Sequence, residues 1–480
     1  MRKSIAVLMA LFLVGAGGFC FIFKGIQAEE NQVQFIPEQE SGDVHAADGL
    51  TILMDASIKE QARWNIQSAF HGGIKTESTF SFGNSKEKPV YQTQNCYPYR
   101  EAYVSSFSGG GITGGDVLSE SSAYGWYSPF LSVFRKLAKE VPEDGQKEFT
   151  VKLKDYVEYY PMRIESDLYS ETVMTNGNEE RAITMLDIKK EAAYADISSI
   201  LQIPVQGELQ LEVMMQKEDD TVYDLSYDMN TFTEDRDVSA HAYSCVTYDG
   251  MLIAVDYRLE KGDGIKVFWI PFTQLAQTTM SWEDEQGNEK TLPCFVPDYQ
   301  AAKLVYEETA GQVSVDYLSA TEDGKDFVMI YRVNGVCSVM RLDSKDGTLL
   351  QKDISGLKEI ATYFRDGDAV IGITDQIAVF DRDSNGDYQT VLLTDNQTDG
   401  EYLQDPAFAW DGERLAVTDA SAGHEGAYRY SYGPSFKLYI YGEKGLLYKG
   451  MYQCTLDDMH FVESYDVNAS GGNRELKWNP

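Results

Sequence analysis

The sequence predicts a mainly β protein, because short apolar runs separated by tight turns dominate the chain from Val246 onward. Three Asp-Gly turns, beginning at Asp323, Asp366 and Asp411, stand 43 and 45 residues apart, and each leads into an apolar run of strand type. A period of this size is that of one blade of a β-propeller. The predicted folded body has about 410 residues, which is at most nine such periods. Because insertions lengthen some repeats, we expect six to eight blades, with seven as the preferred number.

Residues 1–28 are predicted to form a signal anchor or a signal peptide. Two cations precede an apolar stretch from Ser4 to Phe23, which as a helix would span about 30 Å, the thickness of a bilayer core. After Lys24 the next cation is Lys59, so the positive-inside rule places the rest of the chain outside the cytoplasm. We expect a single-pass membrane protein, and cleavage after Ala28, which would give a secreted protein, is the alternative.

The next residues, 29–49, are acidic and polar and predict a solvated linker. The folded body is predicted over residues 50–462, followed by a tail over residues 463–480. Its second part, 241–462, carries the regular repeats. The first part, 50–240, has strand-like runs of uneven spacing and predicts either irregular blades or a separate α+β domain.

One or two helices are expected inside this first part. Ser128 suits the N-cap and Pro129 the first helical position, and apolar residues follow at helical spacing as far as Val141. A weaker helical pattern runs from Asp187 to Leu201.

Four-strand units are predicted in the regular part of the chain. Asn334-Gly335 between two β-rich runs is a strong hairpin signal, because both central residues of a type I′ turn need positive φ. Hairpins at Asp249-Gly250 and across 262–264 predict an earlier blade. The strands expected in the last two units are 360–364, 369–374, 376–380 and 389–394, and then 407–410, 415–418, 437–441 and 446–451, with an insertion over 421–435.

The segment from Val339 to Lys352 resembles the repeat of quinoprotein-like propellers, a PQQ/WD40-type repeat with an Asp, a Thr-Gly turn and a docking Trp in every blade. Asp343 and Gly347 fit this repeat, whereas Gln351 stands at the position of the Trp. The resemblance covers only the carboxy-terminal part of the chain and implies a propeller. Since the residues that hold the quinone in that family have no counterpart here, no cofactor-binding residue is predicted from it.

Composition limits the partners that the chain can have. The net charge is -35, from 76 acidic and 41 basic residues. Nucleic acid and anionic membrane surfaces both require a cationic face, so we expect no nucleic acid partner and membrane contact through the N-terminal helix only. Five of the six cysteines lie outside the apolar segment, and this odd number leaves at least one thiol outside any intramolecular disulfide.

A calcium site is one interpretation of the segment from Asp381 to Asp387. Oxygen-bearing side chains at alternate positions before and after a glycine are typical of the first half of a calcium loop. Leu392 occupies the twelfth position, where an EF-hand requires Glu, so an EF-hand is excluded. An Asx-rich hairpin turn without metal is the alternative. The candidate ligands are Asp381, Asp383, Asn385 and Asp387.

The insertion supplies the candidate ligand-binding residues. Tyr428, Tyr430 and Tyr432 alternate, so in an extended chain they share one face, and His424 lies nearby. Long loops on a rigid scaffold commonly bind ligands, and tyrosine rings can stack on sugars or peptides. An additional hairpin that packs on its own blade explains the same pattern.

No catalytic motif is visible, so the catalytic residues are unknown and an enzyme is the less favoured interpretation. The sequence favours a membrane-anchored extracytoplasmic propeller that binds an envelope protein or a surface glycan as a non-catalytic binding or scaffold protein of the bacterial envelope. Two alternatives stay open. One is a secreted glycosidase or lyase that uses an Asp/Glu pair, and the other is a sensory ectodomain.

Overall fold

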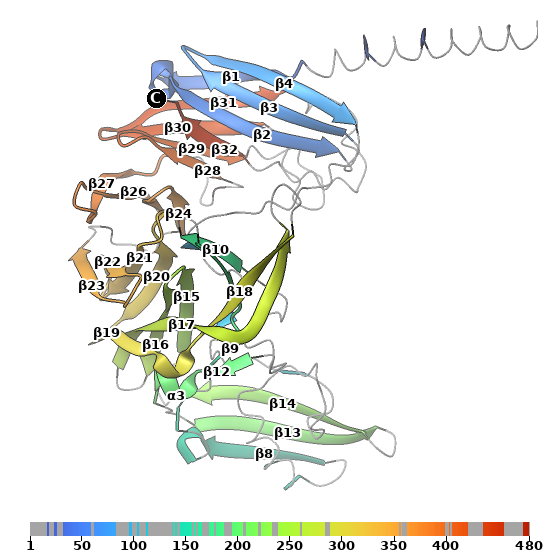
Figure 1. Ribbon diagram of the computed structural model, residues 1–480, viewed down its shortest axis with the longest axis vertical. Helices are drawn as coiled ribbons and strands as arrows, with labels where there is room; N and C mark the ends of the chain where they lie inside the picture. Colours follow the sequence, from blue (N-terminus) through green and yellow to red (C-terminus); the bar gives the residue numbers. More distant parts are fainter. Residues whose placement is uncertain are drawn as a thin grey trace, which may run out of the picture. The chain divides into compact units, whose positions relative to one another are not determined.

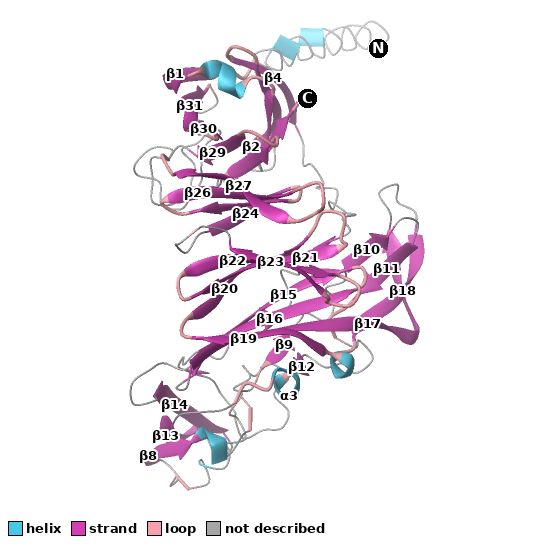
Figure 2. Cartoon of the chain, turned by 90° about the vertical axis from the view of Figure 1, so that its left-hand side faces the viewer, coloured by secondary structure: helices cyan, strands magenta, loops and turns pink. Residues whose placement is uncertain are grey.

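The computed structural model describes residues 32–58, 62–82, most of 145–232, 239–259, 262–283, 289–354 and 362–398, then 406–420, 435–455 and 474–479, with a few short stretches between them. Strands dominate these residues, and the helices among them are short (Figures 1 and 2). The mainly β prediction is confirmed. The chain divides into two compact units, one of residues 1–90, 364–380 and 391–480 and the other of residues 91–363 and 381–390.

Two consecutive four-stranded sheets follow the predicted repeats. Each is ordered as the chain runs, so each has the meander layout of a propeller blade. The first contains β20 (Val313–Ala320), β21 (Asp326–Val333), β22 (Val336–Asp343) and β23 (Leu349–Ile354). The second contains β24 (Thr362–Asp366), β25 (Ala369–Ile373), β26 (Gln376–Arg382) and β27 (Tyr388–Asp395).

Turn chemistry explains why these strands could be placed from sequence. Asn334 and Gly335 both have positive φ, 51° and 78°, as the predicted hairpin requires. A β-bulge between Val315 and Tyr317 shifts the register of β20 against β21 and so sets Asp316 apart from the regular ladder.

The last repeat also forms as predicted but gains a strand from the amino-terminal end. Its own strands are β28 (Ala407–Trp410), β29 (Leu415–Ala420), β30 (Phe436–Gly442) and β31 (Gly445–Cys454). The added strand is β1 (Phe35–Gly42), which pairs antiparallel with β31 and lies beside it in Figure 1.

The carboxy-terminal end of the chain also pairs with a strand from the amino-terminal end. Strand β32 (Glu475–Trp478) pairs with β2 (Leu50–Ile58), which continues into β3 (Ala62–Phe70) and β4 (Ile74–Phe82). The 3₁₀ helix η1 (Val44–Ala47) connects β1 to β2. This differs from the predicted solvated linker over 29–49 and tail over 463–480, because both ranges contain paired strands.

A larger sheet replaces the blade predicted around residues 246–270. Its strands are β10 (Thr172–Asn176), β11 (Glu179–Ile183), β18 (Glu289–Pro297), β17 (Gly262–Glu283), β16 (Gly250–Leu259), β15 (Ser239–Thr247) and β5 (Cys96–Tyr97), with β19 (Lys303–Ala310) also paired to β17. The predicted hairpins are present as β15–β16 and β16–β17. The 22-residue β17 departs from a blade because it pairs with β16, β18 and β19 (Figure 1).

Two further sheets lie in the less regular part. One contains β7 (Ile112–Thr113), β14 (Val222–Phe232), β13 (Glu208–Glu218) and β8 (Gly145–Lys152), and the other β12 (Tyr194–Asp196), β9 (Arg163–Glu165) and β6 (Tyr103–Val104). The remaining short helices are η2 (Leu153–Asp155), α3 (Ser198–Leu201) and η5 (Tyr299–Ala301).

The helix expected over 187–201 is wrong for part of its range. Residues 187–193 lie outside the described residues, and of the described ones Tyr194–Asp196 form β12 while Ser198–Leu201 form α3. Pairing of β12 with β9, a partner that the local pattern does not specify, overrides the helical spacing. The helix predicted from Ser128 falls mostly outside the described residues, although Leu137 and Val141 are buried in a core cluster.

Each unit has its own apolar core. In the first, one cluster packs β1, β2 and β3 on β30 and β31, and another joins β25 and β26 to β29 and β30. In the second, the large sheet packs on one side against the segment around α3 and on the other against β20 and β21. The described cysteine side chains, Cys245, Cys294, Cys337 and Cys454, are buried as thiols.

The apolar segment Ser4–Phe23 falls almost entirely outside the described residues. Within the part of the chain that the structure describes, no helix combines the length and apolar character needed to cross a bilayer. The predicted anchor, the signal peptide alternative and the blade number of seven stay predictions.

Candidate functional site

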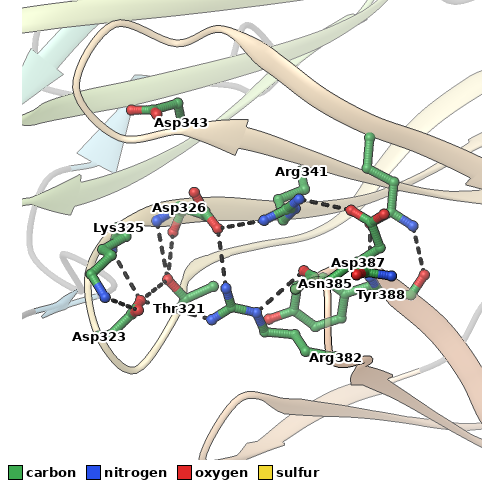
Figure 3. A network of polar contacts seen from close by, with 12 residues as sticks. Thr321, Asp323, Lys325, Asp326, Arg341, Asp343, Arg382, Asn385, Asp387 and Tyr388 are labelled. Atoms are coloured by element: carbon green, nitrogen blue, oxygen red, sulfur yellow. Dashed lines mark hydrogen bonds and ion pairs between the residues drawn. The ribbon is translucent and has the colours of Figure 1, made fainter.

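A turn between β20 and β21 begins a network of charged side chains (Figure 3). Thr321 Oγ1 donates to Asp323 Oδ1 over 2.8 Å and accepts the backbone N–H of Asp326 over 3.1 Å. Lys325 Nζ lies 2.9 Å from Asp323 Oδ2. These bonds hold the Asp-Gly turn closed and fix Asp326 at the start of β21.

Asp326 joins two arginines from different sheets. Its Oδ2 lies 3.0 Å from Arg341 Nη1 and 3.4 Å from Arg382 Nη2, while Arg341 Nη2 lies 2.7 Å from Asp387 Oδ1 (Figure 3). The side chains of Arg341 and Asp326 are only 12% and 8% exposed, so water screens this pair weakly. The network therefore links the β21–β22 hairpin to the turn between β26 and β27.

The predicted calcium loop, Asp381 to Asp387, forms the turn between β26 and β27. Asp383 Oδ1 accepts hydrogen bonds from the N–H groups of Asn385 and Asp387 over 2.7 and 3.0 Å, and these bonds hold the pKa of Asp383 below its usual range. Among the described side chains, no group of three or more His, Cys, Asp or Glu could hold a metal ion. The geometry is that of an Asx-rich turn. Calcium binding by Asp381, Asp383, Asn385 and Asp387 stays an untested prediction.

Gln351, which stands at the Trp position of the resembling repeat, makes a second link between the same sheets. Its Nε2 donates to the carbonyl oxygen of Tyr388 over 2.6 Å, and its Oε1 accepts the N–H of Tyr388 over 2.7 Å. The side chain is buried. A side-chain amide thus docks β23 on the first residue of β27 through two complementary hydrogen bonds, where the repeat would use an aromatic ring.

A third group of polar residues is buried where the large sheet packs against β20 and β21. The bulge in β20 presents Asp316, whose Oδ2 lies 2.5 Å from Arg332 Nη2, and Ser314 Oγ donates to Asp316 Oδ1 over 2.8 Å. The ion pair is 5% and 10% exposed for Asp316 and Arg332. We call this group the buried polar cluster, and its members are Tyr243, Asp256, Ser314, Asp316, Arg332, Cys337 and Tyr363, with the exposed His241 at its edge.

Asp256 supplies the link between the two sheets in this cluster. Its Oδ2 accepts the backbone N–H of Val315 over 2.8 Å, and its Oδ1 lies 3.1 Å from His241 Nδ1. One carboxylate on β16 therefore contacts β15 within its own sheet and β20 in the next.

Aromatic side chains border the cluster. The ring centroids of Tyr317 and Tyr363 are 5.7 Å apart, and the hydroxyl of Tyr363 lies 3.7 Å from Cys337 Sγ. Burial, together with the charges of Asp256 and Asp316, raises the pKa of Tyr243 to about 12. Burial is also the main reason that the pKa values of Asp256 and Tyr363 lie above their usual range. Such perturbed groups gather at functional sites and in structural networks alike.

The hydrogen bonds of the cluster decide what it can do chemically. All four carboxylate oxygens of Asp256 and Asp316 lie within bonding distance of a group of the fold, namely Val315 N, His241 Nδ1, Ser314 Oγ and Arg332 Nη2. A general acid or base must instead reach the proton that it transfers to or from a substrate. The arrangement is that of a structural network in which each of these oxygens is held by a group of the fold.

Replacement of Asp256 by Asn is expected to change the pH dependence of stability. Because the folded-state pKa of Asp256 is raised, its contribution to stability is present below about pH 3.8 and is lost as the pH rises through the folded value. The Asn variant lacks this loss, so its stability relative to the unmodified protein should improve from pH 4 to pH 7 in denaturant titrations. Asp256→Leu is the control, because it removes the acceptor of the Val315 N–H and should cost about 1–3 kcal/mol. An Asp256→Asn difference that does not vary with pH would contradict the assignment.

The structure describes only some of the predicted site residues. Tyr428, Tyr430, Tyr432 and His424 lie outside the described residues. His241 lies at the exposed edge of the buried polar cluster, whereas His45 in η1 pairs with the C-cap residue Asp48 over 2.9 Å. Sequence reasoning missed the cluster, although a charged residue inside an apolar strand, such as Asp256 in Met251–Tyr257, was a signal that could have found it.

Comparisons with known proteins place the chain in no family. No family model matches the sequence, and no curated protein matches it. Among solved structures, one that it is similar to is TolB from Acinetobacter baumannii, with 10% sequence identity over 90% of this chain and 83% of that chain and a TM-score of 0.20. A likeness this low carries no argument, so the description of the blades rests on the sheets themselves.

Proposed function

We propose that the protein is a membrane-anchored, extracytoplasmic binding or scaffold protein of the bacterial envelope with a propeller-like body. The apolar segment Ser4–Phe23 supports the location. One structural observation supports the binding role. The two buried carboxylates of the buried polar cluster, Asp256 and Asp316, are held by the fold's own donors, which makes them supports of a rigid surface.

The location is tested with a carboxy-terminal epitope tag on the full chain. The tag is expected in the membrane fraction and should be destroyed when protease is added to intact spheroplasts. Leu13→Arg places a charge near the centre of the apolar segment, at a cost of about 2.5–3.5 kcal/mol on insertion scales, and should reduce membrane recovery, whereas Leu13→Ala should not. A tag recovered from the cytosol and protected from protease would contradict the location.

The binding role is tested with a soluble body that begins at Asn31 and so retains β1. Saturable binding to purified cell walls or to one membrane protein of the envelope is expected. Arg332→Met, which breaks the ion pair of the buried polar cluster, should weaken this binding, and Lys444→Gln, on the exposed turn between β30 and β31, should not. Release of soluble sugars from the walls would replace the binding role with the glycosidase alternative. Absence of binding to either material would remove support for the proposal.

A further inference from the structure

The folded body begins closer to the apolar segment than the sequence suggests. The N–H of Val33 donates to Ser78 Oγ on β4 over 3.1 Å, and the N–H of Gln34 donates to Thr455 Oγ1 over 3.1 Å. Thr455 returns a bond from its own N–H to the carbonyl oxygen of Gln34 over 3.0 Å. Val33 and Phe35 are 3% and 6% exposed, so the chain is held in the first unit from Val33 onward.

A short length of chain therefore separates the body from the predicted membrane segment. Only residues 24–32 lie between Phe23 and Val33. At no more than about 3.6 Å per residue, this stretch reaches at most about 35 Å when fully extended. A body that began only at Leu50, after the predicted linker over 29–49, would have allowed nearly three times this reach.

We call residues 24–32, which connect the membrane segment to the body, the tether. Strand register shows to which end of the sheet that contains β1 the tether is attached. Phe35 pairs with Cys454, Tyr452 pairs with Phe436, and Phe436 pairs with Ala420. Phe35 and Phe436 also touch, with ring centroids 5.1 Å apart. We call this end of the β1–β31–β30–β29–β28 sheet the near end.

The far end of the same sheet carries tight turns. Gly42 lies there, with the turn between Gly442 and Gly445 and the start of β29 at Leu415. The seven residues of β30 separate the two ends by about 23 Å.

We infer that the near end of this sheet faces the bilayer to which the chain is anchored and that the far end faces away from it. This inference rests on the proposed function, because it requires the apolar segment to stay in the membrane. The lipid surface is the occupant that the tether favours, because nine flexible residues span roughly 17 Å on average, which is less than the distance between the two ends of the sheet. Both ends of the insertion, Ala420 and Ser435, are attached at the near end, so a partner that reaches this end must itself lie at the membrane surface.

Energy transfer to a lipid-borne acceptor tests the orientation in vesicles that contain the full chain. Gln34→Cys places a donor dye at the near end, and Lys444→Cys places one at the far end, where both residues are exposed. Cys20 and Cys96 are first replaced by Ser, while the four buried thiols react slowly. We expect higher transfer efficiency from position 34 than from position 444.

A lengthened tether is the matched control. An insertion of about 20 Gly and Ser residues after Gln27 raises the average length of the tether from roughly 17 Å to roughly 30 Å and should remove most of the difference between the two labels. Equal transfer from both positions with the native tether, or higher transfer from position 444, would overturn the orientation. Flotation of the vesicles distinguishes a wrong orientation from a missing membrane anchor. A chain that does not float with lipid contradicts the membrane anchor itself.

Discussion

Replacement of Gln351 by Glu is expected to make folding strongly dependent on pH. At neutral pH the introduced carboxylate would face the carbonyl oxygen of Tyr388, which now accepts a hydrogen bond from Gln351 Nε2 over 2.6 Å. The site is buried, so an unpaired charge there should cost about 3–5 kcal/mol. When protonated, the same carboxyl can donate to that carbonyl and still accept the N–H of Tyr388, as the native amide does.

The direction of this pH dependence follows from the protonation state that the folded variant prefers. Because only the protonated form restores both bonds, the introduced carboxyl has a folded pKa above its unfolded value of about 4.3. The variant should therefore approach the stability of the unmodified protein near pH 4 and lose it as the pH rises through the raised pKa. Unfolding in denaturant at pH 4, 5.5 and 7, each compared with the unmodified protein, measures this difference.

Gln351→Leu is the control for this experiment. It removes both hydrogen bonds without adding a charge, so it should be destabilised by about 2–4 kcal/mol at every pH. The Glu variant could instead lose the same free energy of unfolding as the Leu variant at every pH. In that case the two hydrogen bonds to Tyr388 do not stabilise the contact between β23 and β27.

The regular blades could be predicted from sequence because their signals are local. Asn334-Gly335 and the Asp-Gly turns specify tight hairpins through the φ values of adjacent residues, and the strands between them follow. The 22-residue β17 could not be predicted in this way, because its length depends on the pairing partners that it meets along its course. The short helix α3 shows the same limit, since pairing of the neighbouring β12 replaced the expected helix.

The buried polar cluster shows why the candidate site was harder to predict than the fold. Asp256 and the Val315 N–H that it accepts are 59 residues apart, and no local pattern relates them. Arg332 and Asp316 lie on neighbouring strands, yet their contact depends on the bulge in β20. The tyrosines of the insertion were predicted as a site from their alternating spacing, which places them on one face of an extended chain but specifies no partner for that face.

Removal of the residues before Leu50 is expected to destabilise the first unit severely. The truncation deletes Val33, Phe35 and Ala47 from the core and opens the edge of β31. It also removes Glu40, whose Oε1 accepts the hydroxyl of Tyr448 over 2.5 Å. Burial of a Val and a Phe contributes about 1.5–3 kcal/mol each, and loss of the carboxylate that accepts the hydroxyls of both Tyr448 and Tyr452, which then keep only each other, costs about 1–2 kcal/mol more. The sum approaches the whole stability of an ordinary domain, about 5–15 kcal/mol.

Thermal unfolding and limited proteolysis of two bodies measure this effect, one beginning at Asn31 and one at Leu50. The longer body should unfold cooperatively and resist protease, whereas the shorter should be cleaved within the sheet β28–β31. Glu40→Gln in the longer body is the milder control, because the amide oxygen can still accept the hydroxyl of Tyr448, so its loss should stay near 1 kcal/mol. Equal melting temperatures for the two bodies would mean that β1 is dispensable, and the tether would then enter the fold at Leu50. In that case the near end of the sheet could stand farther from the bilayer than its present attachment at Val33 allows.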